Sequence, residues 1–266
     1  MPLAVAAGHS LNYEWVNGAG RADATLVFLH EGLGSIRQWR DFPARLAEQL
    51  GCRALVYDRY GYGQSDVLEE PRRSVRFMHD EALKALPELL QAVGITNPIL
   101  VGHSDGASIA LIHAGAGFAV QALVAMAPHV FIEDICIRSI EDAAKTFETT
   151  DFPQRLGRYH RDVRKTFYGW ADVWRDPAFR RWDIREEFLR RIACPVLALQ
   201  GHDDEYGTMA QLDEIARHVP VPCELVKLEK CGHRPFRDQP EGTLAAAAGF
   251  LRKVLEGAGV KREVGQ

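Results

Sequence analysis

The sequence predicts an α/β protein with a mostly parallel central sheet flanked by helices. Short apolar runs rich in β-branched residues alternate along the chain with amphipathic stretches, the pattern of repeated strand and helix units. Glycines and polar side chains follow several of these runs, as they do where parallel strands end beside a ligand site. A length of 266 residues fits one such core with an insertion.

Each element is predicted from its periodicity. Parallel strands are expected at residues 25–29, 53–57, 99–101, 122–127, 196–200 and 223–228. Residues 12–17 are expected to add an antiparallel strand at the edge of the sheet. Helices that cover the sheet are expected at residues 39–50, 79–93, 106–114, 209–217 and 241–255, with right-handed crossovers between the parallel strands.

Composition indicates a globular enzyme domain and excludes several kinds of partner. The net charge of −4 argues against nucleic acid or an acidic membrane surface as a partner. Residues 1–7 lack the basic and long apolar segments of a signal peptide, and no apolar run approaches a membrane span, so we expect a cytoplasmic protein. Five cysteines without C-x-x-C spacing fit free thiols, and we expect neither a metal nor a cofactor.

A candidate nucleophile lies between the run at residues 99–101 and the following helix. Residues 102–106 read Gly-His-Ser-Asp-Gly, a G-x-S-x-G pattern in a strand–turn–helix context. The two glycines fit a tight, strained turn, because a Cβ at either position would collide with the strand or the helix. Ser104 is therefore predicted to be a nucleophile, and the alternative is a serine that caps the helix.

A serine hydroxyl needs a base, and the base needs a group that orients it. The run at residues 196–200 is followed by Gly201 and then by three acidic residues, Asp203, Asp204 and Glu205, while the run at 223–228 is followed by His233. Only one of the three carboxylates can face the imidazole, and the others would be solvated or would cap a helix. For His233, the alternative is a histidine in a surface loop.

The chain order of serine, acid and histidine resembles that of the α/β-hydrolase superfamily. Residues 30–35, His-Glu-Gly-Leu-Gly-Ser, are similar to the family's His-Gly oxyanion loop, and residues 57–65 resemble its D-x-x-G-x-G-x-S segment. The resemblance spans nearly the whole chain and is weakest at residues 131–191. It implies a core domain at 1–130 and 192–266 with a helical cap at 131–191. It also implies that Asp204 is the acid, with Asp203 as the fallback.

The segment expected to form the cap is expected to help select the substrate. Helical patterns cover residues 133–148 and 156–174, and the segment holds enough aromatic side chains to wall an apolar pocket. Glu31, His129 and Trp170 are the candidates for lining this pocket. The arginines of the segment could hold a substrate carboxylate, but we prefer the interpretation that they lie on solvated helix faces.

The backbone N–H of Asp105, which follows the nucleophile, is expected to form one half of an oxyanion hole. The resemblance implies Gly32 as the other donor, with Glu31 as the alternative. Glu31 replaces the glycine that the family commonly has, and a carboxylate there would oppose a developing oxyanion. We prefer an outward Glu31 in a salt bridge, with Arg59 as one candidate cation. The sharper hypothesis is that Glu31 binds a hydroxyl, amine or water of the substrate. His103 is expected to point away from the pocket.

These residues predict a cofactor-independent serine hydrolase that cleaves a small-molecule carboxylic ester or lactone through an acyl-enzyme on Ser104. One alternative is a carbon–carbon bond hydrolase of dienoic ring-cleavage products. Another is a cofactor-free perhydrolase or a ligand-binding homologue. A dehalogenase is disfavoured, since that chemistry needs an aspartate at the elbow. The expected partner is a small-molecule substrate, and the sequence is compatible with a homodimer.

Overall fold

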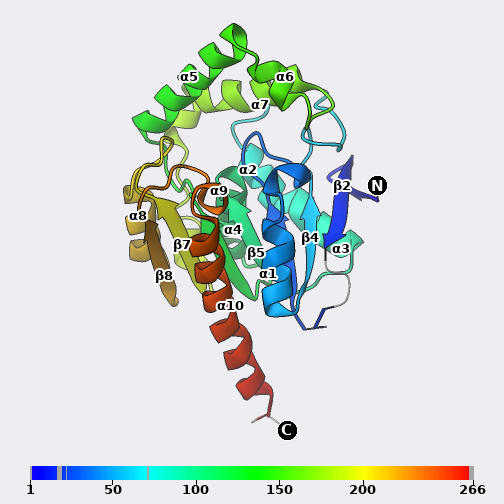
Figure 1. Ribbon diagram of the computed structural model, residues 1–266, viewed down its shortest axis with the longest axis vertical. Coiled ribbons are helices and arrows are strands. Elements are labelled where there is room, and N and C mark those ends of the chain that lie inside the picture. Colours follow the sequence, from blue (N-terminus) through cyan, green and yellow to red (C-terminus); the bar gives the residue numbers. More distant parts are fainter. Residues whose placement is uncertain (1, 17–19, 22, 71, 264–266) are drawn as a thin grey trace.

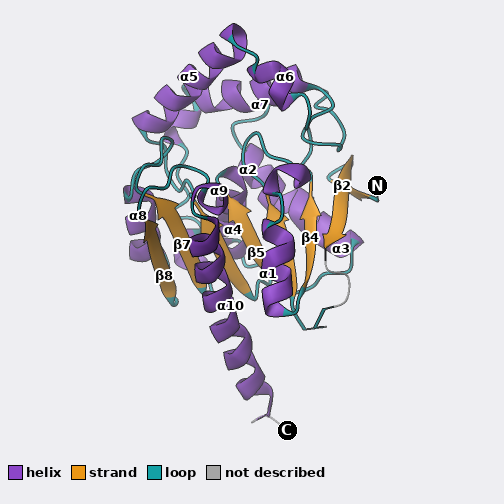
Figure 2. Ribbon diagram, in the orientation of Figure 1, coloured by secondary structure: helices purple, strands orange, loops and turns teal. Residues whose placement is uncertain are grey.

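The computed structural model describes residues 2–16, 20–21, 23–70 and 72–263. Within these residues eight strands form one sheet in the order β1-β2-β4-β3-β5-β6-β7-β8 (Figure 2). The strands are β1 (Leu3–Ala6), β2 (His9–Val16), β3 (Thr25–Leu29), β4 (Arg53–Tyr57), β5 (Ile99–His103), β6 (Ala122–Met126), β7 (Val196–Gly201) and β8 (Cys223–Leu228). The predicted fold class is confirmed.

The strands β3 to β8 run parallel, whereas β2 pairs antiparallel with β4 and β1 pairs antiparallel with β2. The predicted antiparallel strand at residues 12–17 therefore exists, although Asn17 lies outside the described residues. Its predicted place at the edge is wrong, because β1 lies outside it. Ala7 and Gly8 connect the two strands with φ values of 50° and 81°, the conformation of a two-residue hairpin turn.

Helices cover both faces of the sheet (Figure 2). On one face α1 (Phe42–Leu50) and α10 (Pro240–Glu263) pack together and bury the side chains of Leu26 and Phe28 in β3. The other face is covered by α2 (Phe77–Asp80), α3 (Leu86–Ala92), α4 (Asp105–Gly115) and α8 (Ala210–His218). The short helix α9 (Pro235–Asp238) adds Phe236 to the first face. The strands at the centre are buried on both faces, which explains their continuous apolar runs.

Two predicted helices differ in their detail from the observed ones. The stretch predicted as one helix at residues 79–93 contains a π-helical turn, η2 (Glu81–Ala85), between α2 and α3. The helix predicted at 156–174 starts too early: α6 (Phe152–Leu156) ends where it was expected to begin, and the long helix is α7 (Val163–Arg175). This long helix begins at Val163 because the Asp162 side chain accepts a hydrogen bond of 3.0 Å from the backbone N–H of Lys165.

Three helices lie together beyond one end of the sheet (Figure 1). They are α5 (Asp134–Thr149), α6 and α7, all from the segment in which the sequence predicts a cap. Their apolar side chains, among them Phe147 and Phe167, continue the core on the α4 face of the sheet. No helix in the described part of the chain is both long and apolar enough to cross a bilayer.

Candidate active site

Ser104 lies in the sharp turn between β5 and α4, with φ of 53° and ψ of −121°. A non-glycine residue rarely adopts a positive φ, so the backbone is strained at this position. A Cβ on Gly102 would lie 2.5 Å from the Cα of Ala107, and a Cβ on Gly106 would lie 2.0 Å from the carbonyl oxygen of Leu29. Both glycines are therefore needed for the turn. The Ser104 side chain makes no helix-capping hydrogen bond.

The structure brings Ser104, His233 and Asp204 together from three separate loops. The Nε2 atom of His233 lies 2.9 Å from Oγ of Ser104, and its Nδ1 atom lies 2.8 Å from Oδ1 of Asp204. All three side chains are buried. The backbone N–H of Tyr206 and the side-chain amide of Gln200 donate to the Asp204 carboxylate at 2.8 and 3.1 Å, which fixes its orientation.

The two neighbouring acids take other positions. Asp203 is exposed, and Glu205 accepts a hydrogen bond of 3.1 Å from the backbone N–H of His233. Of the three adjacent carboxylates, Asp204 is thus the one that faces the imidazole.

Burial and the contact between Asp204 and His233 determine how these groups titrate. Burial alone would raise the pKa of Asp204, but the imidazole charge and its hydrogen bond lower this pKa below its ordinary value. For His233, burial would lower the pKa, yet the Asp204 carboxylate raises it above its ordinary value. The imidazole of His233 is therefore a good proton acceptor, and the Asp204 carboxylate stabilises the imidazolium that forms when it takes up a proton.

The peptide between Glu31 and Gly32 is held in a single orientation. The Glu31 carbonyl accepts hydrogen bonds from Nδ1 of His30 at 2.7 Å and from Nη2 of Arg59 at 2.9 Å. The Nε2 atom of His30 accepts a hydrogen bond from the backbone N–H of Arg59, so the proton of the neutral ring is on Nδ1. Burial holds the pKa of His30 well below its ordinary value. In a trans peptide the N–H points opposite to the carbonyl, so the N–H of Gly32 points away from Arg59.

Two backbone amides are available beside Ser104. Gly32 lines the cavity described below, and a Cβ there would lie 2.1 Å from Nε1 of Trp170, so only glycine fits. The N–H of Asp105 belongs to the first turn of α4, where amides have no acceptor within the helix. These are the two donors predicted for the oxyanion hole.

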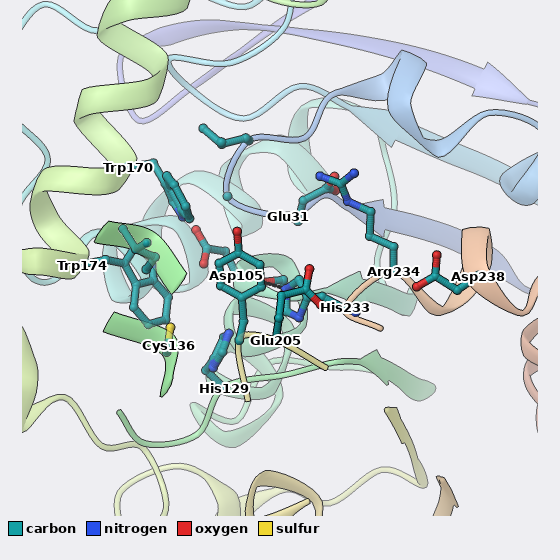
Figure 3. A pocket seen from close by; sticks show the side chains of 15 residues that line it. Glu31, Asp105, His129, Cys136, Trp170, Trp174, Glu205, His233, Arg234 and Asp238 are labelled. Carbon is teal, nitrogen blue, oxygen red and sulfur yellow. Dashed lines mark hydrogen bonds between the residues drawn. The ribbon is translucent and has the colours of Figure 1, made fainter. Parts of the chain in front are cut away.

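A cavity of about 260 Å³ has Ser104 among its lining residues. Figure 3 shows this cavity and labels most of the side chains around it. All three predicted pocket residues, Glu31, His129 and Trp170, line it. The sequence analysis did not single out several other lining residues, namely Leu33, Cys136, Ile140, Trp174, Tyr206, Arg234 and Asp238. The pairs 136/140 and 170/174 show the spacing of residues that share a helix face, which was the signal available in the sequence.

Glu31 does not point outward, so the preferred interpretation is wrong, and the side chain beside its carboxylate is His103 and not the candidate Arg59. The Glu31 side chain is buried, and Oε2 lies 3.3 Å from Nδ1 of His103. Burial would raise the pKa of Glu31, but the hydrogen bond and charge of His103 hold it well below its ordinary value. Gly34 leaves room for the carboxylate, since a Cβ there would lie 2.4 Å from Oε2.

His103 and His129 are both buried close to His233 but differ in their surroundings. His103 is not among the cavity-lining residues, as expected, and its Nε2 lies 2.6 Å from the carbonyl oxygen of His233. His129 lines the cavity, with its ring centroid 5.0 Å from that of Trp174. Burial lowers the pKa of His129 to about 3, so its imidazole is neutral. No group of three His, Cys, Asp or Glu side chains in the described residues could hold a metal ion.

Comparisons with known proteins agree with this architecture. Over 261 residues the chain is 24% identical to 3-oxoadipate enol-lactonase 1 from Acinetobacter baylyi, an alignment that covers 90% of this chain and 92% of the enol-lactonase. A carboxylesterase structure from the thaumarchaeon Nitrososphaera gargenis superposes with a TM-score of 0.76 at 19% identity, covering 96% of this chain and all of the other.

A second solved structure, the alpha/beta hydrolase MGS-M2 from a deep-sea metagenome of the Medee basin, superposes with a TM-score of 0.74 at 20% identity. It covers 94% of this chain and 97% of the other. The sequence model of the alpha/beta hydrolase family matches residues 26–247, which include every strand from β4 to β8 and all the residues of the candidate site. The chain therefore belongs to the alpha/beta hydrolase family.

Proposed function

We propose that this chain is a cofactor-independent serine hydrolase that cleaves a small-molecule carboxylic ester or lactone through an acyl-enzyme on Ser104. The observation that carries the proposal is the pair of contacts at His233, 2.9 Å to the Ser104 hydroxyl and 2.8 Å to the Asp204 carboxylate. Nucleophile, base and orienting acid are all present in hydrogen-bonding geometry.

In the proposed mechanism His233 removes the Ser104 proton as Oγ attacks the substrate carbonyl carbon. Asp204 holds the imidazole in the tautomer that accepts at Nε2 and stabilises the imidazolium. The imidazolium then gives the proton to the leaving oxygen as its bond to the carbonyl carbon breaks. Water attacks the resulting ester with the same base and releases the acid product.

The oxyanion of each tetrahedral intermediate would accept hydrogen bonds from the backbone amides of Asp105 and Gly32. Such donors act mainly in the transition state, and the loss of one typically costs about 3 kcal/mol of barrier stabilisation. The bonds from His30 and Arg59 to the Glu31 carbonyl support this role, because they hold the Gly32 amide in place before substrate arrives.

Two features support a small ester or lactone as the substrate. The cavity is small, about 260 Å³, and Ile140, Trp170 and Trp174 give it apolar walls. The relative from Acinetobacter baylyi is named a lactonase, and the similar archaeal structure is a carboxylesterase. Carbon–carbon bond hydrolysis is less well supported, because no arginine of residues 131–191 lines the cavity.

The test compares wild type with Ser104→Ala on short p-nitrophenyl esters and on lactones. We expect wild type to hydrolyse members of both classes and the variant to fall to background while its circular dichroism spectrum is unchanged. A fluorophosphonate probe should label wild type on Ser104 and leave the variant unlabelled. Ser74→Ala, at an exposed serine outside the cavity, is the matched control.

Full activity in Ser104→Ala would refute the nucleophile assignment. A wild-type protein that neither turns over any ester or lactone nor reacts with the probe would instead point to a ligand-binding homologue.

A further inference from the structure

The proposed mechanism uses the backbone amide of Asp105 and leaves its carboxyl group without a role. This side chain is only 1% exposed, yet it lines the same cavity as Ser104. Figure 3 shows it beside Trp170. Neither carboxylate oxygen has a hydrogen-bond partner in the described residues. A buried acceptor without a donor is costly, so its presence beside a reactive serine calls for an explanation.

The neighbouring cation compensates the charge of Asp105 without satisfying its hydrogen bonds. The Nη2 atom of Arg59 lies 3.8 Å from Oδ2, beyond hydrogen-bonding distance, and the same atom donates to the Glu31 carbonyl. Burial raises the pKa of Asp105 to about 6, although the charges of Arg59, Arg73 and His233 lower it. The carboxylate therefore keeps its full capacity to accept hydrogen bonds.

Other acidic groups surround the same cavity. Glu31 lies on its wall, and Glu205 and Asp238 line it beside His233. Arg234 is the single lysine or arginine among the lining residues in the part of the chain that the structure describes. Arg59 faces Asp105 at 3.8 Å, and the wall carries three further acids, Glu31, Glu205 and Asp238, against the one cation Arg234. Its potential favours a positively charged ligand.

Aromatic side chains complete the surroundings. Trp170 and Trp174, one turn apart on α7, line the cavity next to Asp105 (Figure 3). The face of an indole ring attracts cations, and it does so more strongly where water is excluded. A carboxylate without a donor beside two indole rings is a combination suited to an ammonium group.

We propose that the cavity binds the ammonium group of an aminoacyl substrate, with the Asp105 carboxylate as its hydrogen-bond acceptor. This inference rests on the proposed function, since the substrate is then the ester of an amino acid. Ser104 and Asp105 line the same cavity, so the proposal places the amine on the acyl group close to the ester carbonyl. In this arrangement Trp170 and Trp174 pack against the carbon atoms of the substrate's acyl group and against its ammonium charge.

The test uses three benzyl esters of nearly equal shape. Alanine benzyl ester carries an ammonium group, isobutyrate benzyl ester carries a methyl group in its place, and monobenzyl methylmalonate carries a carboxylate. The ammonium group also activates the ester chemically. The decisive quantity is therefore the ratio of kcat/KM for the alanine ester to that for the isobutyrate ester, compared between wild type and variant.

We expect Asp105→Asn to lower this ratio at least about tenfold, the size of a hydrogen bond to a charged group. Asp142→Asn is the matched control, because it makes the same change on α5, where the carboxylate is 71% exposed and lies outside the cavity. It should leave the ratio as in wild type. An equal ratio in wild type and Asp105→Asn, or a preference of wild type for the methylmalonate ester, would overturn the inference.

A binding measurement separates this inference from the proposed function. In the Ser104→Ala background, calorimetry should show alaninamide binding more tightly than isobutyramide, and Asp105→Asn should weaken alaninamide binding at least about tenfold. If the esters are hydrolysed without this preference, the inference fails and the hydrolase proposal stands. If no ester is hydrolysed but alaninamide binding depends on Asp105, the hydrolase proposal fails and the ammonium site stands. Equal binding of both amides overturns the inference whatever the kinetics show.

Discussion

The Nε2 atom of His103 lies 2.6 Å from the backbone carbonyl oxygen of His233. A carbonyl can only accept, so Nε2 carries a proton, and the Nδ1 atom of His103 faces the Glu31 carboxylate at 3.3 Å. The backbone N–H of His233 is bound in turn by Glu205 at 3.1 Å. Two contacts therefore hold the backbone of the proposed base. One comes from Glu205, which lines the cavity, and the other from His103, which contacts the cavity-lining Glu31.

Substitutions of His103 test whether this contact positions His233. A glutamine side chain can place its amide nitrogen where Nε2 lies, whereas asparagine is too short to reach the His233 carbonyl. We expect His103→Asn to lose about 100-fold in kcat and His103→Gln to lose clearly less, because small displacements of a catalytic group cost this much. Equal kcat in the two variants, measured on a p-nitrophenyl ester, would contradict the positioning role.

The pH dependence tests the role of Asp204. His233 must be neutral to act as a base, and Asp204 raises its pKa above the ordinary value of 6.5. Activity should therefore rise with pH through a pKa above 6.5 in wild type. Asp204→Asn should move this rise to lower pH and reduce kcat by about 10⁴-fold, since the imidazole loses both its orientation and its counter-charge.

Asp203→Asn is the matched control for that experiment, because the Asp203 side chain is exposed and its neighbour Asp204 makes the contact with His233. The kcat/KM profile of this variant should follow that of wild type. A larger loss in Asp203→Asn than in Asp204→Asn would show that the acid is assigned to the wrong carboxylate.

The buried Asp105 carboxyl should lower the stability of the folded protein at neutral pH. Its pKa is raised from 3.8 to about 6, so between these values the folded state binds more protons than the unfolded state, and stability falls as pH rises. A shift of this size corresponds to about 3 kcal/mol above pH 6. Asp105→Asn should therefore raise the free energy of unfolding above pH 6 by about 3 kcal/mol.

Urea denaturation at about pH 4 and about pH 7.5 measures this difference, which should be present at the higher pH and absent at the lower. An asparagine variant that is no more stable than wild type at the higher pH would be at odds with an unsatisfied carboxylate in this position.

The close contact of Gly32 with Trp170 predicts that a substitution at Gly32 lowers kcat and that a second substitution at Trp170 restores part of it. A Cβ on residue 32 would lie 2.1 Å from Nε1 of Trp170, so Gly32→Ala should displace the loop and with it the amide donor. We expect kcat to fall about 100-fold, which corresponds to the loss of one oxyanion donor. Trp170→Ala removes every indole atom that the Cβ would meet, including Nε1 and Cδ1, so the double variant should recover part of the lost kcat. A double variant no better than Gly32→Ala would argue that the indole is not the obstacle.

Local patterns in the sequence were sufficient to predict most of the fold. Continuous apolar runs identified β3 to β7, because strands buried on both faces have no polar alternation. The strand β8 was also predicted, although it carries Glu224 and Lys227 and is only partly buried. The edge strand β1 was missed, since its four residues are half exposed and too short for a pattern. The start of α7 was also missed, because it depends on a single capping bond at Asp162.

The sequence by itself determined the nucleophile turn and the set of residues from which the site is built. The two glycines around Ser104 and the polar residues after strands are local features, and parallel strands necessarily bring their ends to one edge. Only the tertiary structure decided which of three adjacent acids faces His233, that Glu31 turns inward to His103, and that the Asp105 carboxyl lines the cavity. These outcomes depend on side chains that meet from segments as far apart as 129 residues, as Ser104 and His233 do, and local periodicity carries no information about such contacts.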